Sequence, residues 1–168
     1  MKTQKISPKH KLKTPFLNGF PAKFKPLLLK GAVLMGYPKG SHVFRDGEKA
    51  NKFYLILKGK INILAEEQDV RFDQESSIGV LQTLGKGDVA GWSWVIPPYR
   101  WRFDAVAAEN CDVLAIDGAA IRQLMTKNHS FAFEIYRRLV PVMNQRLVAS
   151  RLKLQTFGGK LFQTAEGG

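Results

Sequence analysis

The sequence predicts a mainly β domain, a small sandwich or jelly-roll barrel, with helices flanking it at both ends. Apolar runs of about four to eight residues recur between residues 32 and 117, separated by glycine, proline, aspartate and asparagine, as is typical of short strands joined by turns. After Gly118 the spacing of apolar residues changes from two to about 3.6, which predicts helices instead. The 168 residues, 45% hydrophobic and 24% charged, suit one globular domain with a hydrophobic core.

The first 32 residues combine a basic tail with a helical lead-in. Residues 1–14 are polar and lysine-rich, without apolar periodicity, and we expect a flexible tail. Residues 15–32 carry more apolar side chains, but Gly19, Pro21 and Pro26 interrupt them, which predicts short helical or irregular segments.

The apolar runs that follow are predicted to be the strands of the barrel. Gly40, Gly47 and Gly59 stand between runs, where tight turns need a positive φ. The acidic stretch EEQDVRFDQESS, residues 66–77, indicates a hairpin tip or an insertion. The predicted strands cover residues 32–37, 41–45, 52–59, 60–67, 78–84 and 111–117.

Two helices are predicted after the last strand. Residues 117–128 form a short amphipathic helix and residues 129–157 a longer one, in which Pro141 should kink the helix or begin a new one. An apolar seam repeats along the longer helix at spacings of four and three, which favours a parallel coiled-coil dimer, although packing on its own barrel remains an alternative. Its positions are Tyr136, Val140, Met143, Leu147, Ser150, Leu154 and Phe157.

The expected domain organisation follows from these elements. A β domain with the first helix would cover residues 15–128, the dimerisation helix 129–157 and a short tail 158–168. The basic start lacks the apolar stretch of a secretory signal, and no run approaches the roughly 18 apolar residues of a membrane span, so we expect a cytoplasmic protein. The single cysteine, Cys111, excludes a disulfide within the chain and is expected to be a small core residue.

The formal net charge of +12 is unevenly distributed. Residues 1–45 carry ten Lys and Arg and no acidic residue, and residues 119–168 carry eight against two, while the middle is acidic. Basic ends suit contact with nucleic acid, anionic lipid or an acidic partner. A solvated tail and a helix with surface ion pairs account for them equally well.

Two stretches and the order of the elements indicate a family. YPKGSHVFRDGEKANKFYLILKGKINI, residues 37–63, is followed by the glycine-rich GDVAGW, residues 87–92, and then by two helices. The chain from about Phe16 to Phe157 thus resembles the cyclic-nucleotide-binding domain of the catabolite activator and fumarate–nitrate regulator superfamily. The amino-acid sequence of residues 91–105 further resembles that of small stand-alone bacterial proteins of this superfamily. The resemblance implies a β-roll, a double-stranded jelly roll, with a cyclic-nucleotide pocket and a regulatory, non-enzymatic role in signal transduction.

The resemblance also implies a ligand site, the phosphate cassette, with cyclic AMP or cyclic GMP as the ligand. Its members here would be Gly91, Trp92, Ser93, Arg102 and Asp104. In the family a short helix after the glycine turns its free N–H groups to the cyclic phosphate. Trp92 stands where the family has a glutamate that accepts the ribose hydroxyl, and an indole only donates. The cassette is therefore altered, which implies weak binding of cyclic nucleotide or binding of a related ligand.

The identity of the cassette cation depends on the register. Counting forward from Gly87 places Arg102 at the position of the family's phosphate-binding arginine, whereas counting back from Cys111 places Trp101 there. Adjacent residues of a strand face opposite sides, so the choice decides the charge of the pocket. We favour Arg102. Arg100 and Asp104 then share its face, Asp104 is able to pair with it, and Trp101 and Phe103 lie outside.

Residues 143–154 supply a further implied contact. MNQRLVASRLKL resembles the dimer helix of the catabolite activator, where a Thr-Ser pair contacts adenine. The matching positions are Ser150 and Arg151. The serine hydroxyl can still bond a base edge, whereas the arginine offers no acceptor.

Catalysis and metal binding find no support in the residues. His10, His42 and His129 lie far apart without metal-ligand spacing, and Ser93 has no histidine and acid partner nearby, so we expect no catalytic residue, no metal and no cofactor. In regulators of this superfamily a helix-turn-helix follows the dimer helix. Residues 158–168 are too few for one, and we expect no specific DNA binding by this chain alone.

Three functional hypotheses remain. The first is a dimeric, non-enzymatic regulatory module that binds cyclic nucleotide or a related small anion. The second is an interaction or scaffold protein that keeps the fold and binds no nucleotide. The third is a basic nucleic-acid-associated protein that uses residues 1–30 and 137–160.

Overall fold

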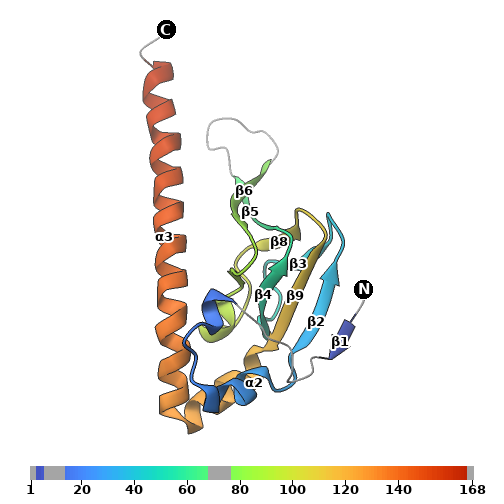
Figure 1. Cartoon of the computed structure of the whole chain (residues 1–168). Coiled ribbons are helices and arrows are strands. Elements are labelled where there is room, and N and C mark those ends of the chain that lie inside the picture. The colour runs from blue at the N-terminus through green and yellow to red at the C-terminus, as the bar shows by residue number, and fades with distance from the viewer. Residues whose placement is uncertain (1–2, 6–13, 68–76, 166–168) are drawn as a thin grey trace.

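Two antiparallel sheets form the body of the molecule (Figure 1). The computed structural model describes residues 3–5, 14–67 and 77–165. One sheet has the order β1-β2-β9-β4-β7 and the other β3-β8-β5-β6. The strands of the first sheet are β1 (Thr3–Lys5), β2 (Val33–Tyr37), β9 (Cys111–Asp117), β4 (Lys52–Lys58) and β7 (Val89–Ala90). Those of the second are β3 (His42–Phe44), β8 (Asp104–Ala107), β5 (Ile61–Glu67) and β6 (Ser77–Leu84). The predicted jelly-roll architecture is confirmed.

Strands β4 and β9 form the centre of the core. They pair antiparallel, with Leu55 opposite Leu114, and both leucines are fully buried. Four consecutive residues of each strand are buried, because one face of this sheet covers the interior of the roll and the other lies under helices. Because both faces of these strands are buried, their sequences are continuous apolar runs and do not alternate between apolar and polar residues.

The glycine turns are as predicted. Gly40, Gly47 and Gly59 have φ values of +83°, +75° and +83°, a region that side chains with a Cβ rarely adopt. Gly59 is further constrained, since a Cβ there would lie 2.5 Å from the Asn110 carbonyl oxygen. The proposed hairpin tip falls partly outside the described residues, because residues 68–76 are not among them.

The N-terminal lead-in consists of short helices, as predicted. They are η1 (Pro15–Leu17), η2 (Ala22–Phe24) and α1 (Lys25–Leu29). Phe20 and Phe24 place their rings edge-on against Phe131 of α3, with centroids 6.3 Å and 5.5 Å from it. Before the lead-in, β1 pairs with the edge of β2, although no apolar alternation predicts a strand there. Backbone pairing at a sheet edge requires no side-chain pattern.

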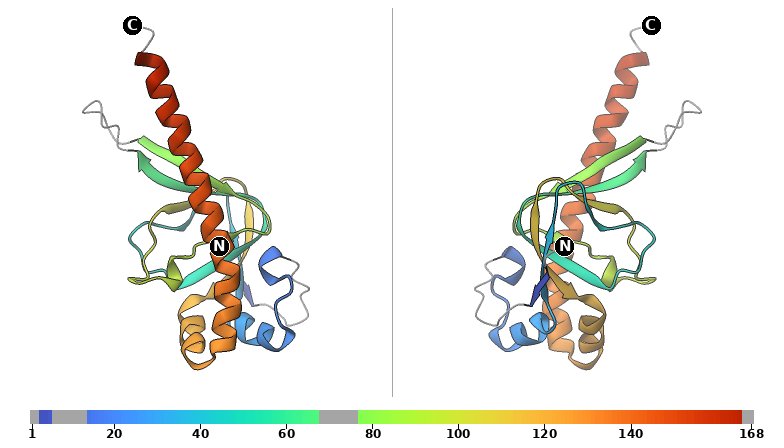
Figure 2. Two further views of the ribbon diagram at one scale, coloured as in Figure 1. Left: turned by 90° about the vertical axis from the view of Figure 1, so that its left-hand side faces the viewer. Right: turned by 90° about the vertical axis from the view of Figure 1, so that its right-hand side faces the viewer.

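Helix α2 (Gly118–Lys127) and helix α3 (His129–Ala165) follow β9. The Asp117 carboxylate caps α2 by accepting from the Ala120 N–H at 2.9 Å. The α3 helix runs unbroken through Pro141, so of the two predicted outcomes, a kink or a new helix, the second does not occur (Figures 1 and 2). Pro141 is exposed, and water can satisfy the carbonyl that its missing N–H leaves free. The helix also extends beyond residue 157, and its C-terminal end projects past the sheets.

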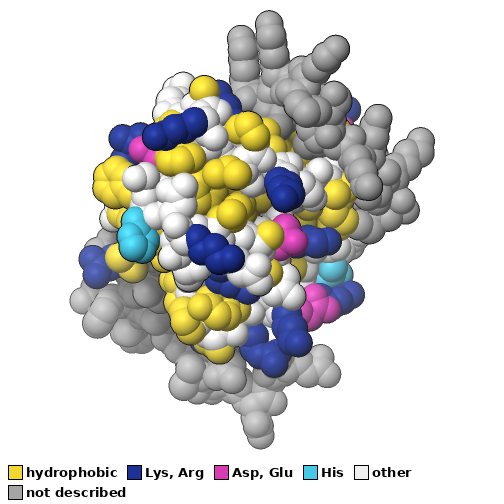
Figure 3. Space-filling model, turned by 90° about the horizontal axis from the view of Figure 1, so that it is seen from below, with side chains coloured by type: hydrophobic (Ala, Val, Ile, Leu, Met, Phe, Trp, Pro, Cys, Tyr) yellow, Lys and Arg dark blue, Asp and Glu magenta, His cyan; other side chains and the backbone are white. Residues whose placement is uncertain are grey.

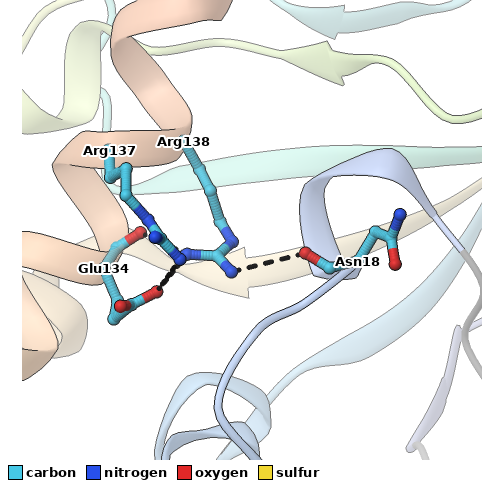
Figure 4. Close-up of polar contacts among 4 residues, drawn as sticks. All are labelled: Asn18, Glu134, Arg137 and Arg138. Carbon is cyan, nitrogen blue, oxygen red and sulfur yellow. Dashed lines mark hydrogen bonds and ion pairs between the residues drawn. The ribbon is translucent and has the colours of Figure 1, made fainter.

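A polar network fastens the base of α3 to the lead-in (Figure 4). The Arg138 guanidinium donates to the Glu134 carboxylate and, at 3.3 Å, to the Asn18 carbonyl, and it lies 4.7 Å from the Phe20 ring centroid. Arg137 donates to the same carboxylate at 3.0 Å. The first turns of α3 are therefore anchored, in contrast to its projecting end.

Basic side chains are dispersed over the underside of the molecule. Figure 3 shows Lys and Arg lying among hydrophobic side chains on that face rather than merged into one stripe. Residues 1–2, 6–13 and the side chains of 152–160, part of the proposed nucleic-acid surface, lie outside the described residues.

Candidate functional site

A cavity of about 520 Å³ lies between the four-stranded sheet, the segment after β7 and helix α3. The segment after β7 includes η3 (Ser93–Val95), a short helix of the kind expected after Gly91. The wall is largely apolar, and none of the described residues lining it is acidic. Its residues are Phe44, Ile63, Leu81, Gln82, Leu84, Val89, Gly91, Trp92, Ser93, Ile96, Trp101, Arg102, Phe103, Met143, Arg146, Leu147 and Ser150.

Trp101 closes the inner side of the cavity against Gly91. Its side chain is only 4% exposed and stacks on the Phe44 ring, with centroids 4.0 Å apart. Gly91 has a φ of +81°, and a Cβ there would lie 2.5 Å from Cζ3 of Trp101. The indole ring thus covers one side of the glycine.

The expectation that Trp101 and Phe103 lie outside is wrong, because both border the cavity, whereas Arg100, expected on the inner face, does not. β8 begins only at Asp104, and Arg102 and Phe103 form a bend, so strict strand alternation does not hold there. The backbone N–H of Trp101 donates to the Glu48 carbonyl at 2.9 Å, and the Trp101 carbonyl accepts from the Gly47 N–H at 3.1 Å, so the backbone at this position pairs with the turn before β4. Arg102 is exposed but still borders the cavity, so both candidates line it.

Asp104 is directed elsewhere. Its carboxylate accepts from the Asp46 N–H at 2.7 Å and lies 3.5 Å from Nε2 of His42. Among the described residues it forms no ion pair with Arg102 and is not part of the cavity wall. The expected pairing with Arg102 is therefore absent, because the turn before β4 takes the carboxylate.

Arg122 of α2 holds the loop that leads from η3 to Trp101. Its Nη1 donates to the Trp94 carbonyl at 2.5 Å, and its guanidinium lies 4.1 Å from the Tyr99 ring centroid. Trp94 is fully buried and stacks on Phe53 at 4.8 Å. No local pattern in the sequence indicates this contact, since 28 positions separate Arg122 from Trp94.

Arg146 of α3 places a second guanidinium at the cavity. Its Nη2 donates to the Val89 carbonyl at 3.0 Å, while its Nη1 is buried without a hydrogen-bond partner. Burial lowers the pKa of Arg146, and the charge of Asp88 partly opposes that shift. No motif in the sequence marks Arg146 as a site residue. Its spacing of four from Ser150 places both residues on one helix face, but the spacing alone does not show that this face borders a cavity.

Comparison with known proteins identifies the family. Residues 34–128 match the model of the cyclic nucleotide-binding domain. The chain belongs to this family. The cAMP-activated global transcriptional regulator CRP of Salmonella typhimurium is 30% identical over 119 residues, which are 70% of this chain and 52% of that protein. The chain thus spans about half the length of the curated relatives it matches.

Solved structures share the fold of this cyclic nucleotide-binding domain. A cyclic nucleotide-binding domain from Methylobacillus flagellatus superimposes with a TM-score of 0.70 at 18% identity, covering 82% of this chain and 74% of that one. A putative cyclic nucleotide-binding protein from Geobacter metallireducens gives 0.66 at 20% identity, covering 80% and 92%. The resemblance noted in the sequence is confirmed.

The site residues implied by the resemblance fall into two groups in this cyclic nucleotide-binding domain. Asp104 and the exposed Arg151 lie outside the cavity wall. Gly91, Trp92, Ser93, Arg102 and Ser150 all border the cavity.

Other reactive groups lie apart from the cavity. Cys111 is 2% exposed, as predicted, and burial raises the pKa of its thiol, which lies 3.0 Å from the Lys60 carbonyl. The described residues contain no cluster of three or more His, Cys, Asp or Glu placed to hold a metal ion. In the same part of the chain no helix is long and apolar enough to cross a membrane.

Proposed function

We propose that this chain is a non-enzymatic regulatory module that binds a small anionic ligand in the cavity between the β-roll and α3. The observation that carries the proposal is the arrangement of two guanidinium groups, Arg102 and Arg146, at one largely apolar cavity of a cyclic nucleotide-binding domain. The volume of about 520 Å³ lies in the range of ligand sites. Arginine at such a site binds carboxylate or phosphate.

Cyclic AMP or cyclic GMP is the reference ligand for this proposal, with weak binding expected. Trp92 offers no acceptor for a ribose hydroxyl, and Trp101 covers one side of Gly91. A lost hydrogen bond in a closed site costs about 1–3 kcal/mol, or roughly one to two decades of affinity. The altered phosphate cassette therefore favours a weakly bound nucleotide or a related anion.

Assembly into a homodimer through α3 belongs to the same proposal. The helix leaves large hydrophobic side chains about half exposed. They are Phe133, Tyr136, Val140, Leu147 and Val148, between 47% and 62% exposed. A stripe of this kind on a long helix is typical of a helix–helix interface.

Titration calorimetry of the purified protein with cyclic AMP, cyclic GMP and cyclic dinucleotides tests the ligand. Where a nucleotide binds, Arg102→Ala should weaken it about tenfold or more, because an ionised hydrogen bond is lost. Arg100→Ala is the matched control, since Arg100 is exposed, donates to the Gly47 carbonyl and lies outside the cavity wall. Equal losses in both variants would contradict a role for Arg102 in the site.

A second candidate is an interaction protein that keeps the fold and binds no nucleotide. The observation that favours it is Trp101, whose ring fills the space beside Gly91. A folded protein that gives no heat with any of these ligands supports this candidate over the first.

A further inference from the structure

The ligand cavity has a composition that a nucleotide does not match. Hydrophobic side chains from the sheets and α3 make most of its wall, and none of the described residues lining it is acidic. A ribose and a base carry several polar groups, each of which costs free energy when it is buried without a partner. A ligand with one charged end and a hydrocarbon body leaves no such group unpaired.

The position of the charged end is also constrained. The Trp101 ring lies against Gly91, so an anion cannot occupy that side of the glycine. Arg102 is exposed to solvent, where its charge is already hydrated. Arg146 is different, because it borders the cavity and its Nη1 is buried without a hydrogen-bond partner among the described residues.

No described side chain satisfies this nitrogen. The Arg146 Nη2 is used by the Val89 carbonyl. Asp88 acts on Arg146 through its charge, but its carboxylate accepts from the Gly85 N–H at 2.8 Å. A buried N–H without an acceptor is destabilising, and an anionic oxygen in the cavity would remove that cost and add a charge-assisted hydrogen bond.

We propose that the cavity binds an apolar organic acid, with its carboxylate on Nη1 of Arg146 and its hydrocarbon part against Trp101 and Met143. The proposal rests on the proposed function and specifies its ligand class. One buried guanidinium balances the single negative charge of a carboxylate. A carboxylate that bears an aromatic ring or an alkyl chain has both the single negative charge and the apolar body that the cavity requires.

The test compares phenylacetate and octanoate with the neutral phenylacetamide by titration calorimetry and by quenching of tryptophan fluorescence. Wild type should bind the acids about tenfold or more tightly than the amide. Arg146→Gln should reduce acid binding to the level of the amide and leave amide binding unchanged. Arg137→Gln is the control, because it removes the same charge from an exposed position of the same helix.

Several outcomes would overturn this assignment. It fails if wild type binds acid and amide equally, a comparison that needs no variant, or if folded Arg146→Gln keeps acid affinity. If cyclic AMP binds and the acids do not, the proposed function stands and the acid ligand is refuted. If neither acids nor cyclic nucleotides bind to protein that circular dichroism shows to be folded, both proposals fail.

Discussion

Gly91 has a φ of +81°, and the Trp101 ring lies on the side toward which a Cβ would project. The two constraints are independent: the first concerns the backbone and the second the packing of an indole that is 4% exposed. The indole cannot retreat readily, since Phe44 stacks on it. The contact between residues 91 and 101 therefore defines the shape of the inner cavity.

Gly91→Ala should destabilise the protein by about 2–4 kcal/mol, because it adds left-handed backbone strain and overpacking against Trp101. Urea unfolding measures the free-energy change. Gly85→Ala is the control, as nothing lies within 4 Å of its Cβ position. That variant should stay within about 1 kcal/mol of wild type. Equal effects at the two positions would contradict the packing described.

At the scale of residues, sequence patterns predicted the positions of turns better than they predicted which side chains point into the cavity. Gly40, Gly47 and Gly59 were predictable because positive φ restricts the residue type at each position itself. The inward position of Trp101 was not, because it depends on a bend at Arg102 and Phe103 that breaks the alternation of a strand. Arg146 was missed because helical spacing does not show which face meets a cavity.

The base of helix α3 is held by Arg138, whose guanidinium contacts Glu134, Asn18 and the Phe20 ring (Figure 4). Arg138→Ala should destabilise the protein by about 1–3 kcal/mol, since it removes one of the two arginine donors to the Glu134 carboxylate and the guanidinium donor to the Asn18 carbonyl. Thermal or urea unfolding measures the loss.

Arg137→Ala is the matched control for that prediction. Arg137 pairs with the same carboxylate, but its side chain is 53% exposed, so the change should be within about 1 kcal/mol. A larger loss for Arg137→Ala than for Arg138→Ala would refute the anchoring role of Arg138.

Glu134 makes the stability of this element dependent on pH. The hydrogen bond from Arg138, opposed in part by desolvation and aided by the charges of Arg137 and Arg138, lowers the pKa of the Glu134 carboxyl. A lowered folded-state pKa gives stability that is fully present above the unfolded-state pKa of about 4.3 and is lost as pH falls through the folded-state value. Glu134→Gln removes this titration.

Melting temperatures of wild type and Glu134→Gln, measured from about pH 7 to about pH 3, test that sign. The advantage of wild type should be constant at the neutral end and shrink below about pH 4.3. An advantage that grows on acidification would show that another group dominates.

At the scale of elements, periodicity predicted the type of most segments and the position of α2 and α3. It failed where a local rule was overridden. Pro141 does not interrupt α3, because its face is exposed, and β1 forms without any side-chain signature by pairing with β2. Contacts between distant elements, such as Arg122 with Trp94, carry no local signal at all.

The apolar stripe of α3 lies on the surface of the molecule. If this stripe is the homodimer interface, a charged residue introduced into it should disrupt the dimer. Val140 is 59% exposed and does not border the cavity. Val140→Glu should therefore convert a dimer to a monomer in light scattering, because a buried carboxylate at a helix interface is costly.

Gln145→Glu supplies the control, since Gln145 is an exposed polar residue of the same helix and its position is turned away from Val140. It should leave the assembly unchanged. A wild type that is monomeric at high micromolar concentration would defeat the dimer itself.

The overall architecture was the most predictable level, because two glycine-rich stretches and the order of elements resemble one family. The volume and charge of the cavity were not, since they arise where η3, the four-stranded sheet and α3 meet. Trp101 and Arg146 lie far apart in sequence and acquire a common role only through that meeting.

One side chain of α3 lies both at the cavity and in the exposed hydrophobic stripe. Leu147 borders the cavity and is also 52% exposed within the hydrophobic stripe. If a ligand and a second subunit both contact this leucine, ligand binding changes the dimerisation constant, and dimerisation changes the affinity for the ligand by the same factor, as thermodynamic reciprocity requires. The apparent dissociation constant of the ligand would then depend on protein concentration, so that the abundance of the protein would itself set its sensitivity to the ligand.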